Sequence, residues 1–383
     1  ANATLDNLSN SPDAETALVK TFIAETRVLR ATFYWWLVDL YGNIPLVTDP
    51  TTDPKNPPPT TPRAEVYDFI VAEIIAALPG LDEVPSGYGR VSKSAANALL
   101  AMVYLNAEVY SGTARWTECV AACDVVINSG MFKLAPTIKE AFALENEGIG
   151  NTEYIWVVGN LAQGGLGNLR HMASLHYSQL PSSPWNGFSV LADFYNKYDP
   201  DDARIDMILV GQQFVLGGPS IGDSAFQRDG VPLVFSVESP ISGASESHGP
   251  RMLKWPIDPD MSGGDAGNDY AIFRYSHILL AKAEAQFMLG NNGDALNLVN
   301  QVRERNFDPA KPIVGTITLD DIFDERGFEF LWEGFRRQDQ IRTGHWGDTW
   351  SNHDTPSADY KKLFPIPQVQ MDANPNLVQN TGY

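Results

Sequence analysis

Three glutamates recur at every fourth position of one predicted helix, and arginines lie close to them in the sequence. Glu325, Glu329 and Glu333 fall at i, i+4 and i+8, which places their carboxylates on a single helix face. A catalytic carboxylate pair has to face its partner across a cleft, with roughly 5–10 Å between the two groups. A ladder on one face does not meet that requirement. We therefore expect these glutamates to form structural ion pairs with Arg326, Arg336 or neighbouring elements.

An acidic loop later in the middle of the chain has the spacing of a calcium-binding loop. Five of its residues match positions 1, 3, 5, 6 and 12 of the EF-hand pattern, namely Asp258, Asp260, Ser262, Gly263 and Asp269. Position 12 is Asp instead of Glu, and two prolines disfavour a helix before the loop. Two interpretations stay open: calcium held by Asp258, Asp260 and Asp269, and a solvated acidic loop, which we favour. The sequence requires no other cofactor.

The overall charge excludes several kinds of partner. The 383 residues carry 47 acidic and 27 basic side chains, a formal net charge of −20. Nucleic acid and anionic lipid both attract clustered Lys and Arg, so neither is an expected partner. No run of 18 or more apolar residues is present to span a membrane. The first residues lack the pattern of a signal peptide, which we expect to be absent or already removed.

Hydrophobic periodicity divides the chain into three parts. Residues 1–130 predict paired helices, including a long one over 14–41. Residues 131–268 are rich in Gly, Pro, Ser and Asn and predict a loop-rich region, with a short strand at 153–158. Residues 269–383 predict a helical hairpin, the glutamate-bearing helix and an extended tail. The helical hairpins are typical of tetratricopeptide-like repeats, so we predict a mainly α scaffold of helix pairs that supports the loop-rich region.

Short sequence blocks follow one another along nearly the whole chain. They include ETRVLRA at 25–31, DLYGNIPLV at 39–47, GRVSK at 89–93, NQVR at 300–303, and LFPIP at 363–367 with NPN and QNTGY after it. In these blocks the chain resembles the SusD/RagB family, the surface glycan-binding lipoproteins of the Bacteroidota. Members of that family normally carry a longer segment before the first block, with a lipobox cysteine. We therefore expect residues 1–130 to be a truncated form of the N-terminal scaffold.

The resemblance implies both an architecture and an activity. It implies four tetratricopeptide-like helix pairs below a loop-rich ligand face. It also implies that the protein binds an oligosaccharide or polysaccharide without catalysis and delivers it to a SusC-like TonB-dependent transporter. The implied location is the cell surface at the outer membrane. The membrane would be reached only through an N-terminal lipid anchor that this chain does not contain.

Sugar binding makes its own demands on side chains. Apolar sugar faces stack on flat aromatic rings, and sugar hydroxyls need fixed donors and acceptors at the ring edges. The region 131–268 offers six candidate ligand-binding residues: Arg170, His171, Tyr177, Trp185, Asn186 and Trp255. Trp185 is the first choice, because it lies between Pro184 and an Asn–Gly turn, where a large ring is hard to bury.

Two other functions stay open. An all-α glycoside hydrolase would need two opposed acids, and Glu153 with Asp199 or Asp202 is the best pair in the sequence. The chain has no HExxH motif, nucleophile elbow or phosphate-binding loop, so we expect no catalytic residues and no enzyme. A peptide-binding helical-repeat scaffold is the third interpretation, and the long non-repeat region counts against it.

Overall fold

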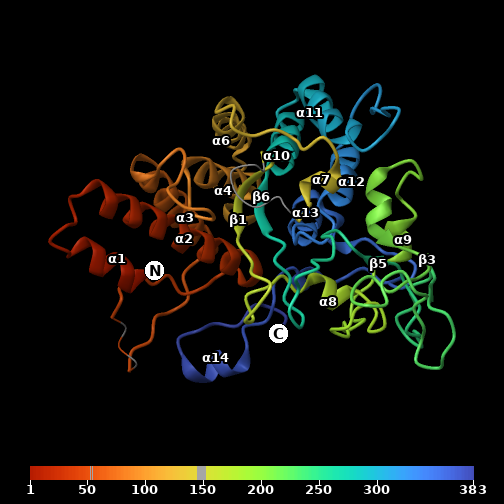
Figure 1. The fold of residues 1–383 in the computed structure, drawn as a ribbon. Helices are drawn as coiled ribbons and strands as arrows, with labels where there is room; N and C mark the ends of the chain where they lie inside the picture. The colour runs from red at the N-terminus through yellow and green to blue at the C-terminus, as the bar shows by residue number, and fades with distance from the viewer. Residues whose placement is uncertain (52, 54, 145–151) are drawn as a thin grey trace.

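Four pairs of helices pack in chain order in the computed structural model, which describes residues 1–51, 53, 55–144 and 152–383. The pairs are α2 (Ala17–Tyr41) with α3 (Arg63–Ala77), α4 (Lys93–Leu105) with α6 (Trp116–Asn128), α10 (Tyr275–Met288) with α11 (Asn292–Glu304), and α12 (Leu319–Glu329) with α13 (Arg336–Thr343). Helix α10 also contacts α6 and α12, so neighbouring pairs form one continuous frame (Figure 1). The prediction of a mainly α fold is confirmed, and the helix predicted over 14–41 is α2.

Local signals determine where these helices begin and end. Thr16 caps α2 by accepting a hydrogen bond from the backbone N–H of Val19, and Ser92 caps α4 in the same way at 3.0 Å from the N–H of Ala95. Gly42 ends α2 with φ at 71°, a conformation that glycine adopts without strain. None of the described helices combines the length and the apolar character needed to cross a membrane.

The core lies between the helix pairs. Wholly buried residues on five of the helices meet there, among them Val28, Ile70, Leu99, Val126 and Leu280. Helix α4 is buried on nearly every face, and its many alanines allow its neighbours to approach closely. Burial of this apolar area, at about 25 cal/mol per Å², is the main force that holds the pairs together.

The loop-rich part contains, within the described residues, three antiparallel sheets of two strands each. Strand β1 (Tyr154–Val158) pairs with β6 (Tyr270–Arg274), β2 (Ile208–Leu209) with β5 (Arg251–Met252), and β3 (Gly211–Gln212) with β4 (Val234–Phe235). Strand β1 confirms the strand predicted at 153–158. The start of the predicted helical hairpin is instead β6, because residues 270–274 pair with β1 before the chain enters α10.

Short helices complete the structure. They are α1 (Asn2–Ser9), η1 (Leu78–Gly80), α5 (Ala107–Ser111), α7 (Ile138–Ala141), α8 (Arg170–Ser174), α9 (Ala192–Tyr195), η3 (Ala203–Met207), η4 (His345–Gly347), η5 (Asp359–Lys362) and α14 (Gln368–Ala373). Of these, α7, α8, α9 and η3 lie in the loop-rich part, which contains no long helix among its described residues. Strands β1 and β6 run through the middle of the molecule, between the frame and these loops (Figure 1).

A buried ion-pair network joins the frame to the loop-rich part. Its centre is Arg274, the last residue of β6, which is wholly buried. The guanidinium of Arg274 lies 2.5 Å from the carboxylate of Glu153, 3.0 Å from that of Glu329 and 2.7 Å from that of Glu333. Lys254 in the loop-rich part contacts Glu333 at 2.5 Å. One cation therefore connects β1, β6 and the end of α12.

The charges in this network balance. Among the described residues, the five cations are Arg204, Lys254, Arg274, Arg303 and Arg305, and the five carboxylates are Glu153, Asp202, Glu325, Glu329 and Glu333. The prediction that the glutamate ladder forms structural ion pairs is confirmed. The ladder pairs with cations on neighbouring elements, whereas Arg326 pairs with Asp339 at 2.8 Å and Arg336 lies over the ring of Phe323 and 3.8 Å from Asp324.

Loss of one carboxylate from this network should destabilise the fold strongly. In Glu329→Gln the side chain keeps its shape, but Arg204, Arg274 and Arg305 lose a shared negative charge in a buried site. We expect the free energy of unfolding to fall by about 3–5 kcal/mol in urea denaturation. Glu83→Gln is the matched control, because Glu83 forms an exposed ion pair with Lys93 and should change the free energy by less than about 1 kcal/mol. Equal effects of the two variants would contradict this assignment.

Stability should also depend on one buried histidine. Burial lowers the pKa of His277 to about 3, whereas an unfolded histidine titrates near 6.5. Between these values the unfolded chain binds a proton that the folded chain does not, so stability falls as the pH is lowered through this window. The slope from this one group is up to about 1.4 kcal/mol per pH unit.

The variant His277→Asn should flatten this dependence. The Nδ1 atom of His277 accepts a hydrogen bond from the backbone N–H of Arg274 at 2.8 Å, and an asparagine Oδ1 can accept in its place. We expect a lower melting temperature than wild type at pH 7 and a smaller further decrease between pH 6.5 and 4.5. Parallel curves of melting temperature against pH would show that His277 is not the group responsible.

Candidate functional site

An open hollow lies on the surface of the loop-rich part. Its volume is about 560 Å³, and its lining residues are Tyr177, Trp185, Asn186, Gln227, Arg228, Asp229, Ser245 and Glu246. Three of the six candidate residues from the sequence are among them: Tyr177, Trp185 and Asn186. We call this site the Trp185 hollow. It combines aromatic rings with amides, carboxylates and one guanidinium.

The backbone around Trp185 holds its ring outward. Trp185 is 58% exposed, although its backbone N–H is fixed by a 2.7 Å hydrogen bond to the carbonyl of Met172 in α8. Ser183 and Asn186 flank the ring with φ of 53° and 51°, a left-handed conformation that few residues other than glycine adopt. Two reversals of the chain so close together leave no neighbouring element to cover the indole.

Asn186 is positioned by a buried arginine. Its Oδ1 atom accepts a 2.9 Å hydrogen bond from Nε of Arg251, and its Nδ2 atom donates to the carbonyl of Glu246 at 2.9 Å. Arg251 is 3% exposed and also donates to the carbonyl of His248 at 2.7 Å. Burial lowers the pKa of Arg251 to about 10, so it stays charged at neutral pH. The amide of Asn186 therefore has one fixed orientation beside Trp185.

The opposite wall is built on Tyr177 and Arg228. The guanidinium carbon of Arg228 lies 4.2 Å from the centre of the Tyr177 ring. The carboxylate of Glu246 accepts a hydrogen bond from the backbone N–H of Arg228 at 2.8 Å and lies 3.6 Å from the buried imidazole of His176. Burial lowers the pKa of His176, which favours the neutral ring at pH 7. Nε of Arg228 also lies 4.0 Å from the carboxylate of Glu246, so an acid stands next to this exposed cation.

The other three candidate residues lie elsewhere, and the prediction needs correction for them. His171 and Trp255 are each 3% exposed, and the indole N–H of Trp255 donates to the carbonyl of Asp269 at 3.1 Å. The guanidinium of Arg170 lies 3.8 Å from the centre of the Tyr270 ring and 5.0 Å from that of Trp255. Packing in the interior of the loop-rich part uses His171 and Trp255, which offer no open face to a ligand, and Arg170 is half-buried against two aromatic rings.

Sequence reasoning missed the five lining residues between 227 and 246. One signal could have found part of them. Asp229–Gly230 forms the tip of a hairpin in which the N–H of Gln227 donates to the carbonyl of Val231 at 2.8 Å. An Asp–Gly pair between apolar residues is a strong sequence indication of such a turn. Ser245 and Glu246 give no comparable local signal.

The structure does not bring the three candidate calcium ligands together. Asp258 accepts backbone hydrogen bonds from Asp260 at 2.8 Å and Gly267 at 2.6 Å, and the carboxylate of Asp269 accepts from the hydroxyl of Tyr88. In the part of the chain that the structure describes, no three acidic, His or Cys side chains are grouped to hold a metal ion. The calcium interpretation is therefore wrong, because these carboxylates stabilise the loop by accepting hydrogen bonds from it.

Removal of calcium provides a direct check. We expect EGTA to leave the melting temperature unchanged and added calcium to raise it no more than added magnesium does, because the carboxylates of Asp258 and Asp269 already have partners within the protein. Asp260→Asn serves as the diagnostic variant, since the side chain of Asp260 is exposed. A calcium-specific rise in the melting temperature that Asp260→Asn abolishes would restore the calcium site.

The acids proposed for a hydrolase do not face an open cleft. Glu153 is wholly buried and contacts Arg274 and Arg305, and Asp202 is 1% exposed and contacts Arg204 at 2.7 Å. Asp199 lies 3.1 Å from Lys311. Each carboxylate is neutralised by a cation in a structural pair, which leaves no opposed pair with room for a substrate.

The frame and the hollow define a class of protein in which stacked helix pairs support a loop-borne aromatic binding surface. Comparison with known families agrees. The model of the SusD family matches residues 236–383, and the model described as starch-binding associating with outer membrane matches residues 1–105. The starch-binding protein SusD of Bacteroides thetaiotaomicron is 26% identical in an alignment that covers all of this chain and 76% of that protein. The chain is therefore similar to the SusD/RagB family over residues 1–105 and 236–383.

Solved structures show the same fold. A SusD superfamily protein from Parabacteroides distasonis superposes with a TM-score of 0.81 at 24% identity, over 100% of this chain and 83% of that one. Surface glycan-binding protein A from Bacteroides thetaiotaomicron, in complex with laminarihexaose, has a TM-score of 0.76 at 21% identity, over 99% of this chain and 82% of that one. The printed names of these relatives describe binding proteins, in agreement with the prediction that the chain is not an enzyme.

Proposed function

We propose that this protein binds a neutral oligosaccharide or polysaccharide in the Trp185 hollow, without catalysis, and delivers it to a SusC-like TonB-dependent transporter. The observation that carries the proposal is the exposed indole of Trp185, held beside a fixed amide and a wall in which an acid stands next to a cation. The starch-binding relative and the structure with laminarihexaose support a carbohydrate ligand.

The chemistry of the hollow suits a sugar. The apolar face of a pyranose ring can stack on the indole of Trp185, which removes apolar area from water on both sides. Its hydroxyls then lie at the edge of the indole, within reach of groups such as Asn186, Arg228 and Asp229. Because the hollow is open, a longer chain can extend from it in either direction.

The charges of the hollow favour a neutral ligand. Arg228 is the only cation among its lining residues, and the carboxylates of Glu246 and Asp229 line the same hollow. An anionic sugar would meet two negative groups there, on a chain whose formal net charge is −20. Uronate-rich and sulfated glycans are therefore disfavoured.

We also propose that the protein works at the cell surface, on the outer membrane. The description of the family model for residues 1–105, starch-binding associating with outer membrane, supports this location. An N-terminal lipid anchor in the full-length protein would hold it there, next to the transporter that receives the glycan.

Removal of the exposed indole should abolish most of the affinity. We expect Trp185→Ala to weaken binding about tenfold or more in calorimetry or affinity electrophoresis, because a tryptophan at the centre of a binding site often contributes 2 kcal/mol or more. The probes are soluble neutral polysaccharides, including amylopectin, laminarin, xylan and mannan. The melting temperature should stay close to that of wild type.

Trp36→Ala is the matched control, because its indole is 41% exposed but lies on α2, in the helical frame. This variant should bind like wild type. An unchanged affinity of Trp185→Ala, with an intact melt, would remove the Trp185 hollow from the site of binding.

A further inference from the structure

The loop that carries Trp185 also carries a second exposed ring. Phe188 is 62% exposed, and its ring meets that of Trp332 edge-on with 6.1 Å between ring centres. Three residues of chain span at most about 11 Å, so the Cα atoms of Trp185 and Phe188 lie within that distance of each other. An aromatic surface therefore continues from the Trp185 hollow toward Trp332.

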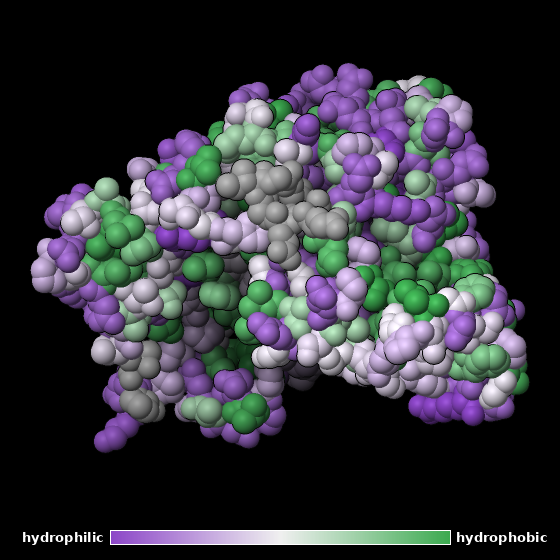
Figure 2. Space-filling model, in the orientation of Figure 1, coloured by the Kyte–Doolittle hydropathy of each residue, from purple (hydrophilic) through white to green (hydrophobic). Residues whose placement is uncertain are grey.

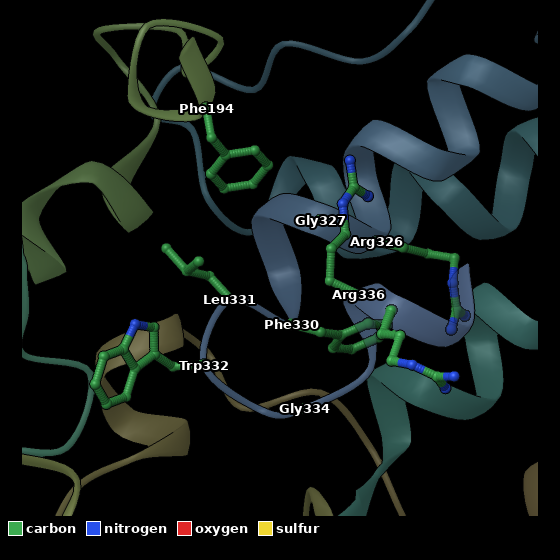
Figure 3. A pocket seen from close by; sticks show the side chains of 9 residues that line it. Phe194, Arg326, Gly327, Phe330, Leu331, Trp332, Gly334 and Arg336 are labelled. Carbon is green, nitrogen blue, oxygen red and sulfur yellow. The ribbon is translucent and has the colours of Figure 1, made fainter. Parts of the chain in front are cut away.

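A second cavity lies beside Trp332. Its volume is about 360 Å³. Phe194, Leu331 and Trp332 stand on one side of it, and Phe330 and Arg336 stand on the other (Figure 3). We call it the Trp332 pocket. Apolar side chains gather on the molecular surface over α9 and β5, the region that includes Phe194 (Figure 2).

The backbone at Trp332 is strained in a way that resembles the Trp185 loop. Among the described residues, three that are not glycine have a positive φ: Ser183, Asn186 and Trp332, the last with φ at 70°. All three lie next to exposed or half-exposed aromatic rings. Such a conformation costs free energy for a bulky residue and persists only where the surroundings enforce it.

The buried network enforces it here. The ammonium of Lys254 donates to the carbonyls of Glu329 at 2.8 Å and Leu331 at 3.1 Å, and the hydroxyl of Tyr270 donates to the carbonyl of Glu333 at 2.6 Å. These bonds fix the backbone on both sides of Trp332. The indole is therefore held in one place, which suits a surface that must recognise a rigid ring.

We propose that the Trp332 pocket is a second sugar subsite, which binds a further unit of the same neutral glycan chain that occupies the Trp185 hollow. This inference rests on the proposed function. The rings of Phe188 and Trp332 supply stacking faces, and Arg336 supplies donors for sugar hydroxyls. Nη1 of Arg336 donates to the carbonyl of Phe323 at 2.6 Å and Nη2 lies 3.8 Å from the carboxylate of Asp324, which leaves other N–H groups of the guanidinium for a ligand.

Continuity with the Trp185 loop identifies the occupant. Phe188 belongs to the same short loop as Trp185, and its ring meets that of Trp332 edge-on, so this loop connects the Trp185 hollow to the Trp332 pocket. The lining of the pocket is aromatic and cationic, and no carboxylate lines it. A neutral chain that leaves the hollow would thus meet stacking faces and donors along its path.

The prediction is a dependence of affinity on chain length. We would titrate maltooligosaccharides and laminarioligosaccharides, from the disaccharide upward, into wild type and three variants. Trp332→Gly removes the ring and leaves a residue that accepts the positive φ, and Phe188→Ala removes an exposed ring. Both should weaken binding of the longer oligosaccharides about three- to tenfold and leave the shortest bound oligosaccharide unaffected. Trp185→Ala should weaken binding at every length.

Phe33→Ala is the matched control, since Phe33 is 52% exposed but lies on α2, in the helical frame. This variant should bind oligosaccharides of every length like wild type. The inference is overturned if Trp332→Gly and Phe188→Ala both bind long chains like wild type while Trp185→Ala does not, a result that leaves the proposed function standing. An equal loss at all lengths in Trp332→Gly would also overturn it, because the ring would then only support the hollow. Wild-type protein that binds none of the polysaccharide panel would overturn both proposals.

Discussion

The buried guanidinium of Arg274 is the constraint on which the rest of the structure depends. It contacts carboxylates from three places: Glu153 before β1, Glu329 at the end of α12, and Glu333 in the following loop. Ions taken out of water are stable only with good geometry and enough partners, so this site tolerates little displacement. The helical frame and the loop-rich part are thereby held in one relative arrangement, which apolar packing alone specifies less strictly.

Two other buried cations fix polar groups close to the surface of the loop-rich part. Arg251 is buried like Arg274, but its hydrogen-bond acceptors are backbone carbonyls and the amide of Asn186. Those of Arg274 are mainly carboxylates. Arg251 fixes an amide beside the exposed indole of Trp185, whereas Lys254 fixes the carbonyls next to Trp332. In both places a cation in the interior determines where an aromatic side chain meets solvent. The rigid part of the molecule thus lies directly beneath the part proposed to bind ligand.

Local sequence predicted the features that depend on local physics. The position of Trp185 between a proline and an Asn–Gly turn indicated an exposed ring, and the spacing of the glutamates indicated structural ion pairs. It could not predict the burial of Trp255, which results from contacts with Phe142, far before it in the sequence, and Tyr270, after it. For the same reason it could not name Arg204 as a partner of Glu325 and Glu329, because Arg204 is more than a hundred residues away.

The hairpin tip at Gln227–Gly230 has a consequence for how such proteins diversify. It contributes much of the polar edge of the hollow, yet its described backbone hydrogen bonds are mostly local, within the hairpin itself. Mutations there can exchange amide, carboxylate and guanidinium groups without disturbing any ion pair of the interior. A few substitutions in this exposed hairpin can therefore alter which ligand the hollow accepts, while the helical frame and the buried ion pairs stay the same.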